Sequence, residues 1–332
     1  MYTSFFDDAR FGDRIEHGRV RPWPLQRLVG PSAGFRSLYP LYAAYFGALR
    51  ADADLLLTSS IAFTKAMRTR AGGMHISYIY TPMRYAWDLN TYLSESSYSP
   101  FARLAARTIR PVMQSWDRRT AQRPDRVVAI SHTVRRRIEA NWRREVDEVI
   151  YPPVRLEEMQ LGTEDDGYYL VAARLLAYRR IDLAVKAFAA LGRELVVVGD
   201  GPERARLEAL AGPSVRFVGH LPREEVVRLF RRCHAYVVPG VEDFGIAPVE
   251  AMAAGKPVIA FRAGGSTETV DEGRTGVFFD EPSAVSLRAA VQTLDSMRFE
   301  AVVLRQHAQA FSADAFRKRW RAILENPATL GL

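Results

Sequence analysis

Short apolar runs alternate with longer amphipathic segments through the second half of the chain. The apolar runs have the length and β-branched content of buried parallel strands, and the segments between them carry apolar residues at helical spacing. We therefore predict strands at residues 168–173, 194–198, 215–218, 235–238 and 258–261. Helices are predicted at residues 182–191, 203–210, 223–232 and from 247 onward. This alternation predicts an α/β fold with a doubly wound parallel sheet and right-handed crossovers.

The first half of the chain has a similar but less complete pattern. Buried-strand runs are predicted at residues 54–60, 76–80, 125–131 and 149–151, and one helix is predicted at residues 133–142. Residues 1–50 are weakly patterned, and we find no Gly-rich loop after a strand near the start. We therefore expect an N-terminal Rossmann-like domain that lacks its first β-α unit, so that the chain begins at what would be the second strand.

Pro152 and Pro153 separate these two patterns, because neither residue continues a helix or a central strand. Residues 284–324 have a helical pattern that is broken near Ser312. We expect the last helix to return to the N-terminal domain. The predicted divisions are an incomplete N-terminal Rossmann-like domain, a complete C-terminal one and a returning helix: residues 1–153, 154–305 and 306–332.

The composition allows two domains of ordinary size, since the chain has 332 residues and 48% of them are hydrophobic. The single cysteine, Cys233, excludes a disulfide within the chain and a cysteine metal site. The first residues do not have the pattern of a signal peptide, and no run reaches the ~18 apolar residues of a membrane span. We therefore expect a cytoplasmic protein whose membrane contact, if it has any, is peripheral at the inner face.

The net charge of +8 is concentrated in one segment. Between Arg103 and Arg144 there are twelve arginines and three acidic residues. Two interpretations stay open: a solvated helix face, or a patch that attracts anionic lipid headgroups or a phosphorylated acceptor. Nucleic-acid binding is disfavoured because the segment contains no recognised nucleic-acid-binding module.

The chemistry is concentrated in residues 239–258, which read P-G-V-E-D-F-G-I-A-P-V-E-A-M-A-A-G-K-P-V. Glu242 and Glu250 have seven residues between them, on a loop that leaves a strand and opens a helix. Such a loop directs backbone N–H groups and the positive end of a helix dipole toward the crevice where α/β sheets bind ligands. An arbitrary pair of this kind would be two solvated acids. In this position, the two carboxylates can reach one ligand from different directions.

Two arginines follow the first strand of the second half, in the string A-A-R-L-L-A-Y-R-R. Arg174 ends the strand and Arg179 lies at the entrance to the next helix. Two cations at a strand end that faces a helix N-terminus can clamp a pyrophosphate. The alternative is an ordinary pair of surface arginines.

Two pairs of glycines follow neighbouring strands. Gly199 and Gly201 do not make a dinucleotide fingerprint, because Arg204 stands where that motif has its third glycine; a strand-to-helix turn is favoured. Gly264 and Gly265 allow a close backbone approach to a ligand or a turn with positive φ. Ser266 and Thr267 are candidates to cap the helix after them.

The string E-D-F-G-I-A-P-V-E-A-M-A-A-G-K-P-V-I-A, followed by R-A-G-G-S-T-E-T-V, resembles the donor-site motif of retaining glycosyltransferases of family 4. These enzymes have two Rossmann-like domains that face a cleft, the GT-B architecture. The resemblance implies that Glu242 binds the hexose, Glu250 binds the ribose, and Arg174 and Arg179 stabilise the departing diphosphate. Its other implied donor-binding residues contribute backbone groups or line the nucleotide pocket: Phe244, Gly245, Ile246, Gly199, Gly201, Gly264 and Gly265.

In the first half, the string Y-I-Y-T-P-M-R-Y-A-W-D from Tyr78 resembles a segment of bacterial mannosyltransferases of polysaccharide or O-antigen assembly. It implies that Tyr80, Thr81 and Arg84 lie on the acceptor side. Tyr80 departs from the family, which has histidine there, and a phenol does not titrate near neutrality. Arg84 and Asp88 are also spaced as an ordinary helical ion pair.

The resemblance implies a hexosyltransferase that uses a nucleotide sugar, GDP-mannose by similarity, and a glycan or lipid-linked acceptor, without metal or other cofactor. Asp52-Ala-Asp54 has the form of a metal-binding motif, but a loop before a strand is favoured. A second hypothesis is a degenerate homologue that binds a nucleotide sugar or a partner protein and transfers nothing. A GT-B epimerase is disfavoured, because the first half offers no convincing acid/base pair.

Overall fold

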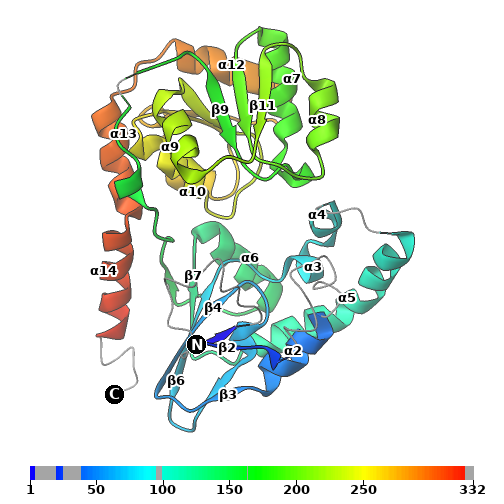
Figure 1. Ribbon diagram of the computed structural model, residues 1–332. Coiled ribbons are helices and arrows are strands. Elements are labelled where there is room, and N and C mark those ends of the chain that lie inside the picture. Colours follow the sequence, from blue (N-terminus) through cyan, green and yellow to red (C-terminus); the bar gives the residue numbers. More distant parts are fainter. Residues whose placement is uncertain (4–19, 25–38, 95–98, 163, 326–332) are drawn as a thin grey trace.

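The computed structural model describes residues 1–3, 20–24, 39–94, 99–162 and 164–325. Figure 1 shows two α/β halves, the C-terminal half above and the N-terminal half below, with the helix α14 running down beside the lower half. Each half is built on a parallel sheet.

The C-terminal half contains a six-stranded parallel sheet in the order β11-β10-β9-β12-β13-β14. Its strands are β9 (Tyr169–Ala172), β10 (Leu195–Val198), β11 (Val215–Gly219), β12 (Ala235–Val238), β13 (Val258–Phe261) and β14 (Gly276–Phe279). Its helices are α7 (Ile181–Leu191), α8 (Arg204–Leu210), α9 (Arg223–Arg232), α10 (Ile246–Ala253), α11 (Ser266–Thr269), α12 (Ala284–Asp295) and α13 (Ala301–Ala308). The five strands predicted from the apolar runs are all confirmed.

Alternate side chains of these strands enter two different cores. In β10, Leu195 and Val197 pack with α7 and α12, whereas Val196 and Val198 belong to the core formed with α9, α10 and α13. Because helices cover both faces of the sheet, every residue of β10 is buried. A strand covered on both faces is expected to read as an uninterrupted apolar run, which is how it was recognised.

The N-terminal half contains a four-stranded parallel sheet in the order β4-β6-β7-β8 and two short two-stranded sheets, β1-β2 and β3-β5. Its strands are β1 (Tyr2–Thr3), β2 (Arg21–Pro22), β3 (Arg50–Ala51), β4 (Leu55–Ser60), β5 (Arg68–Thr69), β6 (Met74–Ile79), β7 (Arg126–Ala129) and β8 (Glu148–Val149). Its helices are α2 (Tyr39–Ala48), α3 (Arg84–Trp87), α4 (Leu89–Ser94), α5 (Pro100–Thr120) and α6 (His132–Trp142).

The helix α2 was not predicted, because the segment around it shows no clear helical period. Its Tyr42 and Phe46 are buried in a small core with Trp23 and Leu56, so tertiary packing accounts for the element. The expectation that the first β-α unit is missing falls largely on residues 4–19 and 25–38, which lie outside the described residues.

The chain returns to the N-terminal half at its end. The amide of Val154 donates to the carbonyl of Phe311 (2.9 Å), so the linker and the C-terminal segment run together. The break predicted near Ser312 is confirmed: its Oγ accepts from the Ala315 amide and caps α14 (Ala313–Leu324). The rings of Phe316 and Trp320 then pack against Tyr78 of β6, at 5.9 and 5.6 Å between centroids.

Candidate active site

The candidate site lies where the order of strands in the C-terminal sheet reverses. The strand β9 is hydrogen-bonded to β10 on one side and to β12 on the other, and the chain continues outward from each. In open α/β sheets, ligands bind outside the carboxyl ends of strands at such a switch point. Arg174 and Arg179 follow β9, and Glu242 follows β12, so the two predicted groups meet there.

Arg179 and Glu242 form an ion pair between the guanidinium Nη1 and the carboxylate Oε1. Both side chains are about a quarter exposed, at 24% and 22%. Among the described residues, the Nε of Arg179 is buried and has no hydrogen-bond partner. The Arg179 guanidinium is therefore partly desolvated, and its Nε–H donor has no acceptor among the described residues.

Glycines let the two loops approach this closely. A Cβ on Gly240 would lie 2.6 Å from the carbonyl oxygen of Arg179, which no side chain permits. Gly201 faces the carbonyl of Leu175 at 2.4 Å in the same way. Gly199 has a φ of +122° and faces the Ala173 carbonyl. Gly199 and Gly201 thus form a strand-to-helix turn that packs against the segment bearing Arg174, which is exposed.

Gly264 and Gly265 support the loop of Glu242 from the other side. The Gly265 amide donates to the Glu242 carbonyl (2.8 Å), and a Cβ on Gly265 would lie 2.4 Å from the Phe244 Cα. These two positions are glycine because the backbone of the Glu242 loop approaches them too closely for a Cβ. The prediction that Ser266 or Thr267 caps α11 is wrong, because Gly265 holds the cap position without a side-chain bond.

The loop ends in the first turn of α10. Gly245 precedes the helix with a φ of +94°, and Ile246 is half exposed. The Phe244 side chain is buried, and its ring stacks on Tyr151 at 5.5 Å and meets Phe311 at 5.6 Å. Phe244 therefore anchors the loop to the linker and to the C-terminal segment, while the α10 N-terminus stays accessible.

Glu250 has a separate partner that sequence reasoning missed. Arg223, at the start of α9, donates from Nη2 to Glu250 Oε1 (2.6 Å) and from Nε to Glu158 (2.8 Å). Glu250 is 8% exposed, and burial raises its pKa although Arg223 opposes the shift. No local pattern links residues 223 and 250, because helix packing brings them together.

Asp243, next to Glu242, ties the loop to the N-terminal half. Its carboxylate accepts from Arg84 of α3 (2.7 Å) and from Arg137 of α6, and its carbonyl accepts from Ser131 (2.6 Å). Arg84 therefore pairs across the boundary between the halves, and its interpretation as a partner of Asp88 is wrong. Asp243, Arg137 and Ser131 were not singled out, since their partners lie more than 100 residues away in the chain.

Tyr178 lies between cations from both halves. The Arg84 guanidinium is 5.0 Å from its ring centroid and the Arg179 guanidinium is 5.1 Å from it. Cations at this distance interact favourably with an aromatic face. The Tyr178 ring thus lies between an arginine of each half, and each of these arginines is also paired with a carboxylate.

Glu268 makes a second link across the boundary. Its two carboxylate oxygens accept from the amides of His132 and Thr133, and from the Thr133 hydroxyl, all at 2.7 Å. A carboxylate at this position satisfies free amides and complements the α6 dipole. Burial and the Glu268 carboxylate raise the pKa of Tyr151 to about 12.

The acceptor-side residues of the resemblance lie at the carboxyl end of β6. Thr81 is buried, and Tyr80 is 37% exposed with its ring 5.4 Å from Tyr78. In the part of the chain that the structure describes, no hydrogen bond, ion pair or ring contact joins Tyr80 to the loop of Glu242. Asp54, of the possible metal motif, pairs with Arg70 on the surface.

The chain is similar to known proteins in both sequence and fold. Residues 156–311 match the family model described as "Glycosyl transferases group 1". A GDP-mannose-dependent alpha-mannosyltransferase of Mycolicibacterium smegmatis is 31% identical over 196 residues, which cover 55% of this chain and 52% of that protein. The chain thus spans about half the length of this curated relative.

Solved structures establish the fold of the whole. Sucrose-phosphate synthase from Thermosynechococcus elongatus has a TM-score of 0.68 at 20% identity, over 94% of this chain and 84% of that one. Anabaena HepE in complex with UDP-glucose has a TM-score of 0.64 at 16% identity, over 96% and 88%. The chain therefore has the GT-B fold of these enzymes, with a parallel sheet in each half.

Proposed function

We propose that this protein is a retaining glycosyltransferase that transfers a hexose, mannose from GDP-mannose, to a glycan or glycolipid acceptor. The observation that supports it most is the Arg179–Glu242 pair at the switch point of the C-terminal sheet, beside the α10 N-terminus. The group 1 match over residues 156–311 and the similarity to a GDP-mannose-dependent enzyme support the reaction class and the donor.

The donor diphosphate would bind Arg174, Arg179 and the free amides at the start of α10. The Nε–H of Arg179, which has no partner among the described residues, would donate a hydrogen bond to such an anion. The charge that develops on the departing diphosphate would be stabilised by these preorganised cations and amides, which contribute several kcal/mol in comparable sites. No metal or other cofactor is needed for this step.

The two carboxylates would bind different parts of the donor. Glu242 would accept hydrogen bonds from the hexose hydroxyls while remaining against Arg179. Glu250 would accept from the ribose hydroxyls with its remaining lone pairs, and Arg223 keeps it oriented. The acceptor hydroxyl would attack from the face that the diphosphate leaves, and the departing phosphate oxygen would take its proton.

The acceptor would approach from the N-terminal half, past Arg84 and Tyr80. A tyrosine at position 80 donates a hydrogen bond but does not exchange a proton near neutrality. The proton of the acceptor hydroxyl would therefore pass to the leaving group and not to residue 80. Because a tyrosine stands at position 80 where the family has histidine, a homologue that binds donor without transferring it is the second candidate function.

One experiment tests the proposal and separates these candidates. GDP-mannose, UDP-glucose and ADP-glucose are titrated into the protein by calorimetry, and transfer to lipid-linked and oligosaccharide acceptors is followed with the anomeric configuration read by NMR. We expect GDP-mannose to bind and the product to keep the donor configuration. Donor binding without transfer to any acceptor would favour the binding homologue, and an inverted product would contradict the retaining reaction.

Matched variants make the test specific to the site. Glu242→Gln and Arg179→Gln should each lower the rate of transfer by about 10²–10³-fold, because each removes charge from the reacting end of the donor. Glu225→Gln and Arg228→Gln change the same residue types in an exposed pair on α9 and should leave transfer unchanged. Unchanged turnover in the site variants would overturn the assignment.

A further inference from the structure

The first part of α5 presents an apolar stripe to solvent. Phe101 is 81% exposed, and Leu104 and Val112 are each 63% exposed. Residues at these spacings lie on one face of an α-helix, and Thr108, also exposed, lies between them. In a soluble helix this face would normally be polar, so the stripe requires an explanation.

Arg107 lies beside the stripe, on the side of Leu104, and Arg103 lies further round the helix, about 100° from Leu104. Arg103 and Arg107 are exposed and one turn apart, and Arg110 turns back to donate to the Ala86 carbonyl (2.9 Å). Residues 99–116 contain no acidic residue. The exposed surface is therefore apolar and cationic at the same time.

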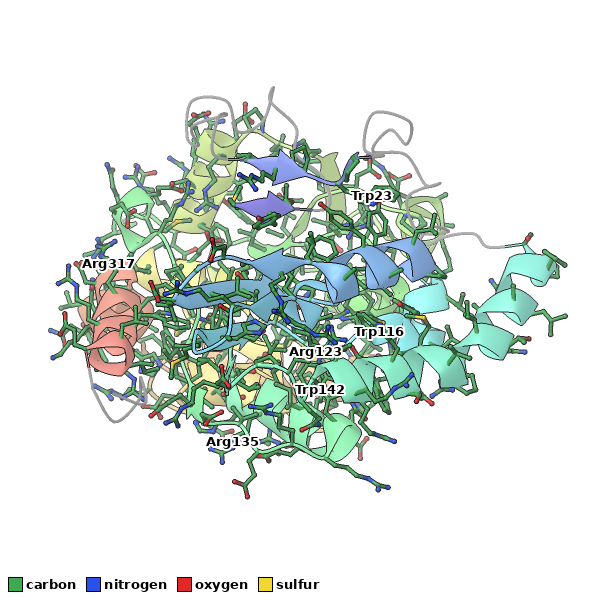
Figure 2. The ribbon with its side chains drawn as sticks, turned by 90° about the horizontal axis from the view of Figure 1, so that it is seen from below. Trp23, Trp116, Arg123, Arg135, Trp142 and Arg317 are labelled. Atoms are coloured by element: carbon green, nitrogen blue, oxygen red, sulfur yellow. The ribbon has the colours of Figure 1, made fainter. Side chains whose placement is uncertain are left out.

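Most of the other arginines between Arg103 and Arg144 do not contribute to such a surface. Their guanidinium groups bind backbone carbonyls or acidic side chains of the same protein. Examples are Arg118 with Asn141, Arg123 with Gly47, Arg126 with Asp147, Arg137 with Asp243 and Arg144 with Asp125. Figure 2 shows Arg123 among the helices and Arg135 at the rim.

The second part of α5 holds the helix in place. Met113 is buried and Asp117 is fully buried, so α5 is anchored from about its fourth turn onward. Figures 1 and 2 show its first part projecting from the side of the N-terminal half. The stripe therefore sits on a rigid support that extends away from the body.

We propose that residues 100–112 of α5 lie on an anionic lipid bilayer, with Phe101, Leu104 and Val112 in the boundary between headgroups and acyl chains. Arg103 and Arg107 would contact lipid phosphates beside them. A cationic and apolar helix face without acids matches the surface of anionic lipids, which offers negative charge above hydrocarbon. Among the described residues, no helix is long and apolar enough to cross a bilayer, so the contact is peripheral.

The lipid contact is argued independently of the proposed function. Only its consequence for the acceptor, which deepens that function, rests on it. The helix before α5 is α4, which packs against the 3₁₀ turn at Ala177–Arg179 that carries a candidate catalytic arginine. A lipid surface held by α5 would therefore lie beside the edge of the site. The acceptor chemistry that fits is a saccharide on a lipid anchor.

Vesicle flotation tests the contact. The full chain is mixed with phosphatidylcholine vesicles with or without phosphatidylglycerol, at low and high salt. We expect it to float with the anionic vesicles only, and less at high salt. The triple variant Phe101→Ser/Leu104→Ser/Val112→Ser should lower partitioning by more than about 100-fold. Arg103→Gln/Arg107→Gln should lower it by about tenfold or more.

Two control variants change the same residue types elsewhere. Val285→Ser/Val302→Ser removes exposed apolar side chains of the C-terminal half, and Arg206→Gln/Arg228→Gln removes exposed arginines there. Both should float like the wild type. Equal flotation of wild type and the triple variant, or none by the wild type, would overturn the proposal. So would a triple variant that turns a dimer into a monomer without changing flotation, since the stripe would then bind a second copy.

Nucleotide-sugar binding is measured on the same samples by thermal shift. The α5 variants should bind GDP-mannose as the wild type does, because the stripe lies outside the donor site. A protein that floats but binds no nucleotide sugar would contradict the proposed function and leave the lipid contact standing. A protein that binds GDP-mannose but never floats would contradict the lipid contact and leave the proposed function standing.

Discussion

The two halves of the molecule use charged residues in opposite ways. In the C-terminal half, Arg179 and Glu242 stand at the carboxyl ends of strands, partly exposed and facing the boundary. In the N-terminal half, Lys65 and Asp117 form an ion pair (2.5 Å) that is 1% and 0% exposed. A pair of a basic and an acidic residue thus stands at the candidate site in one half and lies in the core of the other.

The environment of the buried pair explains how it is tolerated. The indole N–H groups of Trp87 and Trp142 donate to Asp117 Oδ2, at 2.7 and 2.6 Å. The Lys65 ammonium lies 5.2 and 5.1 Å from the rings of Trp116 and Trp142. Burial lowers the pKa of Lys65, and the Asp117 carboxylate opposes this. A buried charge is stable only with such complete pairing. The location of each charged pair, at the strand ends or in the core, therefore distinguishes the candidate site from the buried structural pair.

Breaking the buried pair should have the largest effect. Asp117→Ala leaves Lys65 unpaired and removes the acceptor of two indoles, which should destabilise the N-terminal half by about 3–5 kcal/mol. Tryptophan fluorescence in a denaturant titration measures it, because Trp23, Trp87, Trp116 and Trp142 lie in this half and Trp320 packs on it. Asp314→Ala, in an exposed pair, is the control. Equal unfolding midpoints for the two variants would contradict the comparison.

A buried histidine should make the N-terminal half sensitive to acid. Burial lowers the pKa of His75 from 6.5 to about 4, with Asp125 opposing and Arg144 reinforcing the shift. Between pH 6.5 and about pH 4, the His75 imidazole is protonated in the unfolded chain and neutral in the folded chain. Stability present above pH 6.5 is therefore lost as the pH falls to about 4, by about 3 kcal/mol in total.

Urea titrations across this pH range measure the effect. His75→Gln cannot titrate and should flatten the pH dependence of the fluorescence midpoint. If wild type and variant lose stability in parallel, other groups cause the acid sensitivity.

Crowding the donor loop should damage function in the C-terminal half and leave its fold intact. Gly265→Ala places a Cβ 2.4 Å from the Phe244 backbone and should displace the loop of Glu242. Overpacking of this kind typically costs about 1–3 kcal/mol, so donor affinity should fall by roughly 10–100-fold. Gly47→Ala, whose Cβ would come no closer than 3.8 Å to Arg123, is the control. Calorimetric affinities equal to wild type would show that the loop is not held by this contact.

The smallest effect is expected at the boundary between the halves. Glu268→Gln removes the charge that complements the α6 N-terminus and weakens its bonds to His132 and Thr133, by about 1 kcal/mol. Hydrogen exchange of amides 132–134 should accelerate by about fivefold. Glu272→Gln, in an exposed pair with Arg262, should not change it. Unchanged protection in Glu268→Gln would mean that other contacts order this turn.

Local patterns were enough for five of the six strands of the C-terminal sheet and for locating the loop of Glu242. The run Leu195–Val198 identified a strand because burial on both faces leaves no polar position in it. The loop from Pro239 to Ile246 was singled out because it leaves a strand and opens a helix, and because its string resembles a donor-site motif; both signals lie within a few residues of chain. The break at Ser312 was readable because a helix cap is also local.

Only the tertiary structure decided which charges meet. Arg223 reaches Glu250 and Arg84 reaches Asp243 through packing of elements that are 27 and 159 residues apart. It also separated the arginines that bind neighbouring backbone from those that remain on the surface of α5. The physical reason is that a side chain's partner depends on which faces are buried together, whereas a strand, a cap or a phosphate loop depends on neighbours along the chain.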